Sequence, residues 1–378
     1  MAIKDYEFWF VVGTQFLYGE DIFETINSHA AEMCEEWSKT MPCRIVAKPC
    51  VKTSQEILAV MQAANGDENC AGVITWMHTF SPSKAWIAGF NALQKPYLHV
   101  NTQYNRDIPW QDIDMDFMNL NQSAHGDREH GFITARMRLK RKVIAGYWKD
   151  PAFQNKMETW IRAAVGAAES RKVHVLRISD NMRNVAVTDG DKIEAQIKLG
   201  WQVDHYGVGD IIKEVDAVTE DEIDAQMAEY EKYYIMDTDN IDAVRYQARE
   251  EVAIKKFLDR YDFNAFHTNF EDLQQLRQLP GLAAQDLMRR GYGFGAEGDW
   301  KVAAMLRVMT CMAEGLDGGT VFMEDYTYHF EPGREMLLGS HMLEVSPQCA
   351  AEKPKIQVHP LGIGDREDPA RLVFKAKT

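Results

Sequence analysis

The sequence has no paired cysteines and no long apolar run. Its six cysteines are scattered without a Cys-x-x-Cys, a pattern typical of reduced thiols in a cytoplasmic protein and not of a disulfide framework. No apolar stretch approaches the roughly 20 residues that cross a bilayer. The N-terminus lacks the basic and apolar regions of a signal peptide. We therefore expect a cytoplasmic protein without a membrane partner.

Basic charge is also scarce. The chain has 42 Lys and Arg residues against 57 Asp and Glu residues, a formal net charge of −15. A surface this acidic repels phosphate backbones, which excludes nucleic acid as a partner, whereas a neutral polyol substrate is indifferent to the field. The length of 378 residues, 46% of them hydrophobic, predicts two or three domains with substantial cores.

Motifs for phosphate binding and nucleophilic catalysis are missing as well. The first strand-to-helix loop, residues 13–19, contains neither a Gly-x-Gly-x-x-Gly nor a Walker A lysine, so we expect no nucleotide cofactor there. No serine lies in a Gly-x-Ser-x-Gly elbow, and no cysteine has a recognisable histidine partner. The loop is rich in glutamine and aromatic residues, which can instead hydrogen-bond a sugar.

Apolar strand-like runs alternate with helical patterns over most of the chain. Strands are expected at 7–12, 44–47, 72–76, 96–100, 172–178, 200–205 and 263–269. This alternation predicts an α/β fold with two Rossmann-like, doubly wound domains, 1–171 and 172–319. Residues 129–171 are expected to be largely helical, with the basic run 136–142 as a solvated helix face.

The pattern changes after residue 320. Four strand-like runs, 321–323, 336–342, 355–359 and 371–376, are joined by turn-rich links and predict a β-rich, barrel-like C-terminal domain over 320–378. Four strands leave an open sheet edge, which proteins usually cover. We therefore expect this domain to be incomplete at Thr378.

Three residues, Glu297, Glu324 and His341, are candidate metal ligands. Glu297 stands between glycines at a loop-to-helix junction, and Glu324 follows an apolar strand-like run. Two carboxylates and one imidazole suit Mn²⁺, Mg²⁺ or Co²⁺. The alternative is a surface or capping role for each glutamate and a structural role for the histidine. Spacing alone leaves both readings open.

Six stretches carry a resemblance that covers the whole chain. They are Val12-Gly-Thr-Gln-Phe-Leu-Tyr-Gly19, Asn119-Leu-Asn-Gln-Ser-Ala-His-Gly126, Asp180-Asn-Met-Arg183, Gly293-Phe-Gly-Ala-Glu-Gly-Asp-Trp-Lys301, Phe322-Met-Glu-Asp-Tyr326 and Gly339-Ser-His-Met-Leu-Glu344. Together they resemble the bacterial L-arabinose isomerase family. The resemblance implies a Mn²⁺-activated enzyme that converts L-arabinose to L-ribulose, and D-galactose to D-tagatose more weakly. It also implies a homohexamer, a dimer of trimers.

The same resemblance implies roles for individual residues. Glu297, Glu324 and His341 match metal ligands of the family, and the two glutamates match its acid/base pair. Other motif residues match positions that line the sugar pocket: Gln15, Leu17, Gln122 and His125, supplied by a neighbouring subunit, and Met182 and Phe270. The family has a further histidine ligand beyond the end of this chain, and His359 matches a different position.

These roles predict isomerisation through a metal-stabilised cis-enediol, with Glu297 as the base and Glu324 as its partner. A metal-mediated hydride shift would need the same ligands. Two alternative functions also fit the sequence. One is a sugar-binding or assembly-competent but inactive homologue, and the other is an isomerase of a related sugar such as L-fucose.

Overall fold

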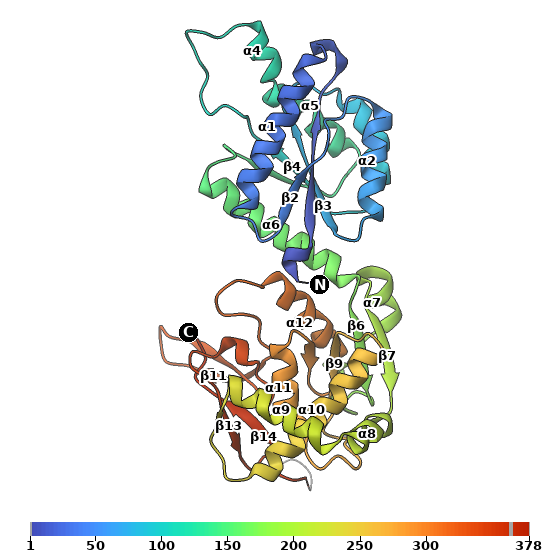
Figure 1. Ribbon diagram of the computed structural model, residues 1–378, viewed down its shortest axis with the longest axis vertical. Helices are drawn as coiled ribbons and strands as arrows, with labels where there is room; N and C mark the ends of the chain where they lie inside the picture. Colours follow the sequence, from blue (N-terminus) through green and yellow to red (C-terminus); the bar gives the residue numbers. More distant parts are fainter. Residues whose placement is uncertain (1, 363–365, 378) are drawn as a thin grey trace. The chain divides into compact units, whose positions relative to one another are not determined.

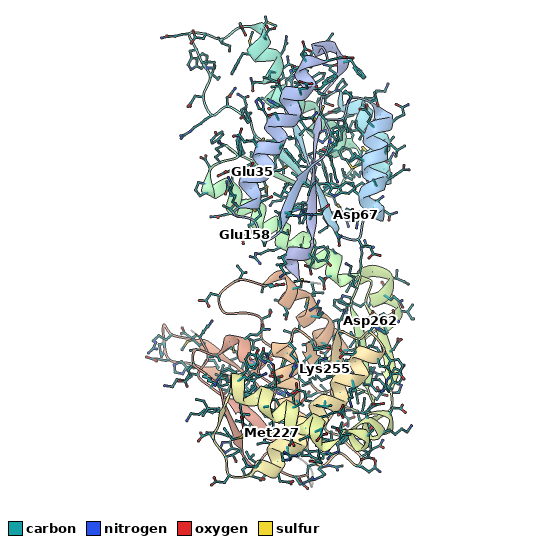
Figure 2. The ribbon with its side chains drawn as sticks, in the orientation of Figure 1. Glu35, Asp67, Glu158, Met227, Lys255 and Asp262 are labelled. Carbon is teal, nitrogen blue, oxygen red and sulfur yellow. The ribbon has the colours of Figure 1, made fainter. Side chains whose placement is uncertain are left out.

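The computed structural model describes residues 2–362 and 366–377, which fold into two compact units (Figure 1). Unit 1 is Met1–Ala168 and unit 2 is Glu169–Thr378. Helices in both units turn charged side chains outward. Glu35 on helix α1, for example, has a side chain that is 79% exposed (Figure 2). No helix among the described residues is long and apolar enough to cross a bilayer.

Unit 1 is built on a five-stranded parallel sheet with the strand order β2-β1-β3-β4-β5. The strands are β1 (Glu7–Gly13), β2 (Arg44–Ala47), β3 (Cys70–Met77), β4 (Tyr97–Asn101) and β5 (Lys142–Ala145). Strands β1 and β3 are buried almost throughout, as expected for central parallel strands covered on both faces. The near-continuous apolar run at 7–12 correctly predicts β1.

Helices cover both faces of this sheet, with α1 on one side and α2 on the other (Figure 1). They are α1 (Asp21–Ser38), α2 (Ser54–Gly66), α3 (Ile87–Ala92), α4 (Met115–Leu120), α5 (Ser123–Arg136) and α6 (Pro151–Ser170). The start of α2 follows the local sequence: Thr53 accepts from the Glu56 backbone N–H, and the Glu56 carboxylate accepts from the Thr53 N–H. This reciprocal cap fixes the helix start.

The expectation of a largely helical segment over 129–171 is wrong in its middle. Helix α5 ends at Arg136, and β5 pairs in parallel with β4 before α6 begins. The basic run 136–142 therefore spans a helix end, a loop and a strand start, not one helix face. Only Ile144 of β5 is buried, so the strand carries no apolar alternation and depends on its pairing with β4.

Unit 2 contains a four-stranded parallel sheet with the order β10-β9-β6-β7. Its strands are β6 (His174–Ile178), β7 (Gln202–Tyr206), β9 (Ala265–His267) and β10 (Gly293–Gly295). The helices are α7 (Lys192–Leu199), α8 (Val208–Ala217), α9 (Glu220–Tyr233), α10 (Ile241–Arg260), α11 (Gly281–Arg289) and α12 (Trp300–Met312). These parallel sheets with their helices confirm the α/β class.

Two glycines explain why β10 carries so little strand signal. A Cβ atom on Gly293 would lie 2.1 Å from the Ala303 carbonyl oxygen, and one on Gly295 would lie 2.1 Å from the Asp299 carbonyl oxygen. Both contacts are with the start of α12, which packs directly onto the strand. Side chains are excluded here by close backbone approach, so the strand reads as a glycine-rich loop.

The C-terminal strands form two small sheets. Strands β11 (Glu324–His329) and β12 (Met336–Ser340) make an antiparallel hairpin. Strand β13 (Lys355–Val358) pairs with β14 (Ala370–Val373) and with β8 (Ile235–Met236), which precedes α10 in the chain. The strand expected at 321–323 is wrong, since those residues are irregular and β11 begins at Glu324. The barrel-like arrangement stays a prediction.

The C-terminal strands share a core with the central helices. Ile356 and Leu372 lie in the same apolar cluster as Leu282 of α11. The Gln285 side chain of α11 donates to the Leu372 carbonyl oxygen at 3.3 Å and accepts from its N–H at 2.7 Å. One helix therefore anchors β14 through both backbone groups, and residues after 320 are held against the sheet that precedes them.

Candidate functional site

Three loops meet at the carboxyl edge of the sheet in unit 2. They follow β6, β9 and β10, and backbone hydrogen bonds join them: the Met182 N–H donates to the Glu297 carbonyl oxygen at 3.1 Å, and the Gly298 N–H donates to that of Thr268 at 3.0 Å. Ligands of open parallel sheets bind at this edge. The loops place Met182 beside Glu297, and Phe270 lies partly buried against the same core.

Glu297 sits in a strained turn between β10 and α12. Its φ is +59° and that of Gly298 is +86°, both in the left-handed region that side chains disfavour. A Cβ on Gly298 would also lie 2.5 Å from the Asn181 Cα atom. Asp299 then caps α12 by accepting from the N–H groups of Lys301 and Val302. The backbone thus holds Glu297 in a defined orientation at the sheet edge.

Glu324 and His341 are brought together by the hairpin. Register pairs Glu324 at the start of β11 with Ser340 at the end of β12, and His341 follows directly. As a result the Glu324 Oε1 atom lies 3.6 Å from the His341 Nε2 atom. Phe322 packs edge-to-face on the His341 ring with centroids 5.0 Å apart. These contacts fix the ring beside the carboxylate.

Electrostatic interactions place Glu297 in the same neighbourhood. Burial raises the pKa of Glu324, and the nearby Glu297 carboxylate raises it further, while His341 opposes the change. Burial by itself lowers the pKa of His341, but the carboxylates around the ring, Glu344 first among them and Glu297 included, outweigh it and raise that pKa. Like charges therefore crowd a half-buried site.

Glu344 is a residue to which the sequence analysis assigns no role. It is buried, and its Oε2 atom lies 2.6 Å from the His341 Nδ1 atom, although the two do not complete a well-directed hydrogen bond. A carboxylate behind a ring nitrogen orients the imidazole and leaves the other nitrogen to face a ligand. The only sequence signal was the spacing of three residues within a quoted motif.

The donors suit a hard divalent ion, although the described residues, 2–362 and 366–377, do not contain three His, Cys, Asp or Glu side chains drawn together tightly enough to hold one. Two ligands that each lie roughly 2.1 Å from one ion are themselves about 3–3.5 Å apart. The 3.6 Å between Glu324 and His341 is close to that separation. Glu297 and Glu324 also border one cavity of about 470 Å³, together with Phe322 and Tyr326.

A second group of predicted residues lies in unit 1, where the sheet order changes direction between β1 and β3. The Gln15 Nε2 atom donates to the Tyr18 hydroxyl at 3.1 Å, and that hydroxyl donates to Gln122 Oε1 at 2.9 Å. Tyr18 thus connects the two glutamines, a role that the sequence analysis missed because a tyrosine next to aromatic residues carries no distinguishing signal.

The other two unit 1 candidates have few contacts of their own. Leu17 is 80% exposed, which is unusual for a leucine at a strand-to-helix loop. His125 packs edge-to-face against Phe80 with ring centroids 4.9 Å apart. The structure therefore gathers Gln15, Leu17, Gln122 and His125 on the loops of unit 1, and Met182, Phe270, Glu297, Glu324 and His341 in unit 2.

Comparison with known proteins gives a consistent match. Models of the L-arabinose isomerase N-terminal, central and C-terminal domains match residues 2–172, 174–315 and 319–378. The L-arabinose isomerase of Shouchella clausii is 55% identical over 98% of this chain and 76% of its own length. That of Bacillus subtilis is 54% identical over 99% of this chain and 76% of its own.

A relative from a thermophile is equally similar. The L-arabinose isomerase of Thermotoga neapolitana is 54% identical over 98% of this chain and 76% of its own length. Among solved structures, a periplasmic sugar-binding protein from Legionella pneumophila covers 82% of this chain and 95% of its own at 10% identity. Its TM-score of 0.18 carries no argument about fold or function.

Proposed function

The chain belongs to the L-arabinose isomerase family and is an isomerase. From this premise we propose that it interconverts L-arabinose and L-ribulose, with Glu297 and Glu324 as its acid–base pair. The observation that carries the proposal is the shared cavity that Glu297 and Glu324 border, with His341 beside Glu324.

Isomerisation requires a proton to leave C2 of the sugar and a proton to arrive at C1. One carboxylate can remove the first while the other, protonated, donates to a neighbouring oxygen, and the roles reverse for the return reaction. We assign Glu297 as the base, since the strained turn and Gly298 hold it in one orientation. Glu324, more buried and beside another carboxylate, takes the partner role.

We propose that Glu297, Glu324 and His341 hold a divalent metal ion, Mn²⁺ by resemblance, with Co²⁺ and Mg²⁺ as alternatives. The ion would supply Lewis-acid stabilisation of the negative charge that develops on the sugar oxygens. Glu344 would keep the His341 Nδ1 atom engaged, so that Nε2 remains available on the side of Glu324.

The remaining predicted residues would bind the sugar. The hydrogen-bonded Gln15, Tyr18 and Gln122 offer amide and hydroxyl groups of the kind that pair with sugar hydroxyls. Leu17 and His125 would complete that surface, and Met182 and Phe270 would line the pocket wall near Glu297. By resemblance, the first group acts in a neighbouring subunit's site.

The family resemblance extends the proposal further. We propose weaker action on D-galactose to give D-tagatose, a cytoplasmic homohexamer made of two trimers, and a barrel-like arrangement of the β-rich segment. The cysteines are free thiols, and five of the six are buried. That state is typical of a reducing compartment.

A ketose assay tests the proposal. The protein is incubated with L-arabinose, D-galactose and L-fucose after EDTA treatment and again after adding Mn²⁺. We expect L-ribulose to form fastest, only after the metal is restored. Preference for L-fucose would identify a related isomerase, and no ketose with any sugar would identify a binding protein. Deuterium at C2 separates proton transfer, which exchanges with solvent, from a hydride shift, which retains the label.

A further inference from the structure

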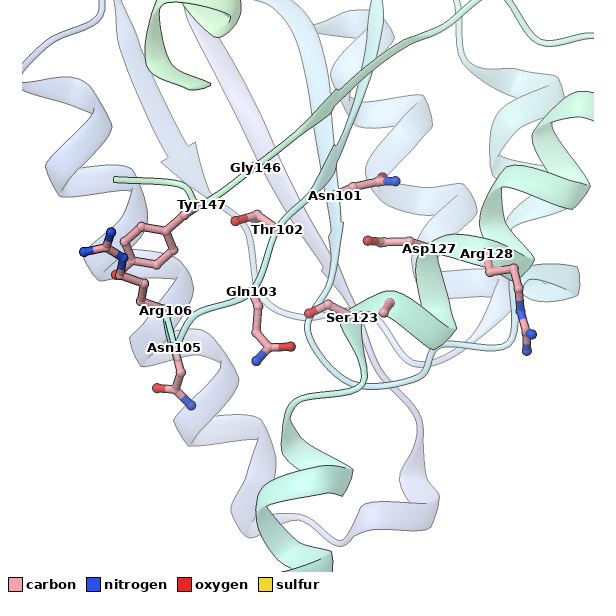
Figure 3. Close-up of a pocket in the computed structure, with 11 residues that line it drawn as sticks. Asn101, Thr102, Gln103, Asn105, Arg106, Ser123, Asp127, Arg128, Gly146 and Tyr147 are labelled. Carbon is pink, nitrogen blue, oxygen red and sulfur yellow. The ribbon is translucent and has the colours of Figure 1, made fainter. Parts of the chain in front are cut away.

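Unit 1 contains a cavity of about 520 Å³ that the proposed reaction does not use (Figure 3). It lies at the carboxyl ends of β4 and β5, next to the first turn of α5. Its volume falls within the range of small-molecule sites, roughly 300–1,000 Å³. The carboxyl edge of a parallel sheet is also where such folds bind ligands.

Three polar atoms in the cavity lining lack hydrogen-bond partners among the described residues. They are Asn101 Oδ1, Thr102 Oγ1 and Ser123 Oγ. Thr102 is only 6% exposed and Ser123 only 2%. Buried polar atoms are nearly always paired, and an unpaired one destabilises the free protein. Three such atoms around one cavity indicate that a polar ligand pairs with them.

A fourth group, the Asp127 carboxylate, is held in place from behind. Its Oδ1 atom lies 2.9 Å from His99 Nε2, and His99 Nδ1 lies 2.8 Å from the Thr75 hydroxyl, all within the buried interior. The hydrogen bonds of this carboxylate in the described part of the chain go to Oδ1. Figure 3 shows Asp127 and Ser123 projecting from α5 toward the loop after β4. The Oδ2 atom can therefore accept from a ligand hydroxyl.

The chemistry of the lining matches a neutral ligand. Asn101, Thr102 and Ser123 both donate and accept, as hydroxyl groups do. An anionic ligand would meet the Asp127 carboxylate, while the two guanidinium groups, Arg106 and Arg128, are exposed at opposite sides of the cavity. Tyr147 adds a half-buried ring whose face can contact C–H groups.

We propose that this cavity binds a neutral polyhydroxylated molecule of monosaccharide size. The site is distinct from the crevice at the ends of β1 and β3, because Gln122 turns away from the cavity to accept from Tyr18 there. It is a second sugar-class site in unit 1, outside the residues assigned to isomerisation.

Equilibrium dialysis with radiolabelled L-arabinitol tests the proposal without requiring turnover or a metal ion. The combined variant Thr102→Val and Ser123→Ala removes two unpaired hydroxyls. We expect it to bind L-arabinitol at this site at least about tenfold more weakly, which corresponds to one or two lost hydrogen bonds. Its turnover of L-arabinose should be unchanged, because neither residue belongs to the acid–base or substrate-binding set.

Two controls make the test specific. Thr134→Val removes a buried hydroxyl that already donates to the His130 carbonyl oxygen at 2.8 Å, so it should leave L-arabinitol binding unchanged. Gln122→Leu alters the other crevice and should keep the binding that depends on Thr102. If the combined variant does not fold, Tyr147→Ala serves in its place with the same expected loss.

Identical L-arabinitol isotherms for the wild type and the Thr102→Val, Ser123→Ala variant would overturn the proposal. So would displacement of L-arabinitol from the Thr102-dependent site by inorganic phosphate, which would make it an anion site. Because the readout is binding, an inactive wild-type protein that still shows the Thr102-dependent event would count against the proposed isomerase function only.

Discussion

The Nδ1 atom of His341 lies 2.6 Å from Oε2 of Glu344, a carboxylate buried behind the imidazole ring. This arrangement leaves the Nε2 atom on the side of Glu324, 3.6 Å from its Oε1 atom. A histidine oriented in this way by a second carboxylate is typical of metal ligands in proteins. Glu344 therefore supports the proposed metal site without touching the substrate.

Replacing Glu344 with glutamine should weaken metal binding. The amide cannot match the carboxylate in orienting His341, and loss of such an outer partner typically costs 10–100-fold in metal affinity. We expect a Mn²⁺ affinity reduced by that factor in equilibrium dialysis, with turnover recovering at high Mn²⁺. The control is Glu331→Gln, since Glu331 contacts the exposed His329 in the same hairpin. Equal Mn²⁺ affinities for the wild type and Glu344→Gln would show that Glu344 is merely structural.

Replacing either member of the acid–base pair should abolish most turnover. Glu297→Gln and Glu324→Gln each remove a group that exchanges protons with the sugar, so we expect kcat to fall by at least about 10²-fold. Asp325→Asn is the matched control, because Asp325 neighbours Glu324 in β11 and is exposed. Ketose formation measures the effect. Turnover within a few-fold of the wild type in either glutamine variant would remove that residue from the mechanism.

Tyr18→Phe should weaken substrate binding more than it slows chemistry. The substitution breaks the hydrogen bonds that connect Gln15 and Gln122 through the Tyr18 hydroxyl. One such bond contributes about 0.5–1.5 kcal/mol, so we expect KM to rise roughly 2–10-fold while kcat changes little. The comparison is Tyr104→Phe, which loses a contact with the exposed Glu32 carboxylate. A fall in kcat with KM unchanged would argue that Tyr18 acts in the chemical step.

The buried carboxylates of unit 2 predict a pH-dependent stability. Burial raises the pKa of Glu251 well above its usual value. Burial also acts to raise the pKa of Asp286, but hydrogen bonds, that of Arg289 first, lower it to about 2. The contribution of Glu251 is thus full at acid pH and lost as pH rises from about 4.5. That of Asp286 is present above pH 4 and lost as pH falls toward 2.

Glu251→Gln isolates the first contribution. Its amide keeps an oxygen to accept from the Tyr230 hydroxyl, as Glu251 does at 2.6 Å, and cannot ionise. Measured by urea unfolding between pH 4.5 and 8, the variant should gain stability relative to the wild type as pH rises. Glu222→Gln, on exposed α9, should show no such gain. A stability difference that stays constant over this range would contradict the assignment of Glu251.

Much of the fold follows from local sequence, and the exceptions have physical causes. The apolar run of β1 and the cap at Thr53 are confirmed because both depend on neighbouring residues. Strands β5 and β10 escape prediction because one is an edge strand with a single buried residue and the other is held by backbone packing against α12. Pairing between distant segments determines both.

The site is predictable only in part for the same reason. Motif resemblance points to Glu297, Glu324 and His341, and their roles stay predictions. Glu344 and Tyr18 act through contacts that only the folded chain creates, at 2.6 Å from His341 and 2.9 Å from Gln122. Neither residue type is unusual at its position, so no local pattern distinguishes it.

The most direct test of the metal site is anomalous X-ray scattering from crystals of the protein soaked in Mn²⁺. We predict a peak within roughly 2.0–2.6 Å of a Glu297 oxygen, a Glu324 oxygen and His341 Nε2, the range in which divalent ions bind protein ligands. A fully occupied peak elsewhere, with these three side chains bound to no ion, would contradict the account.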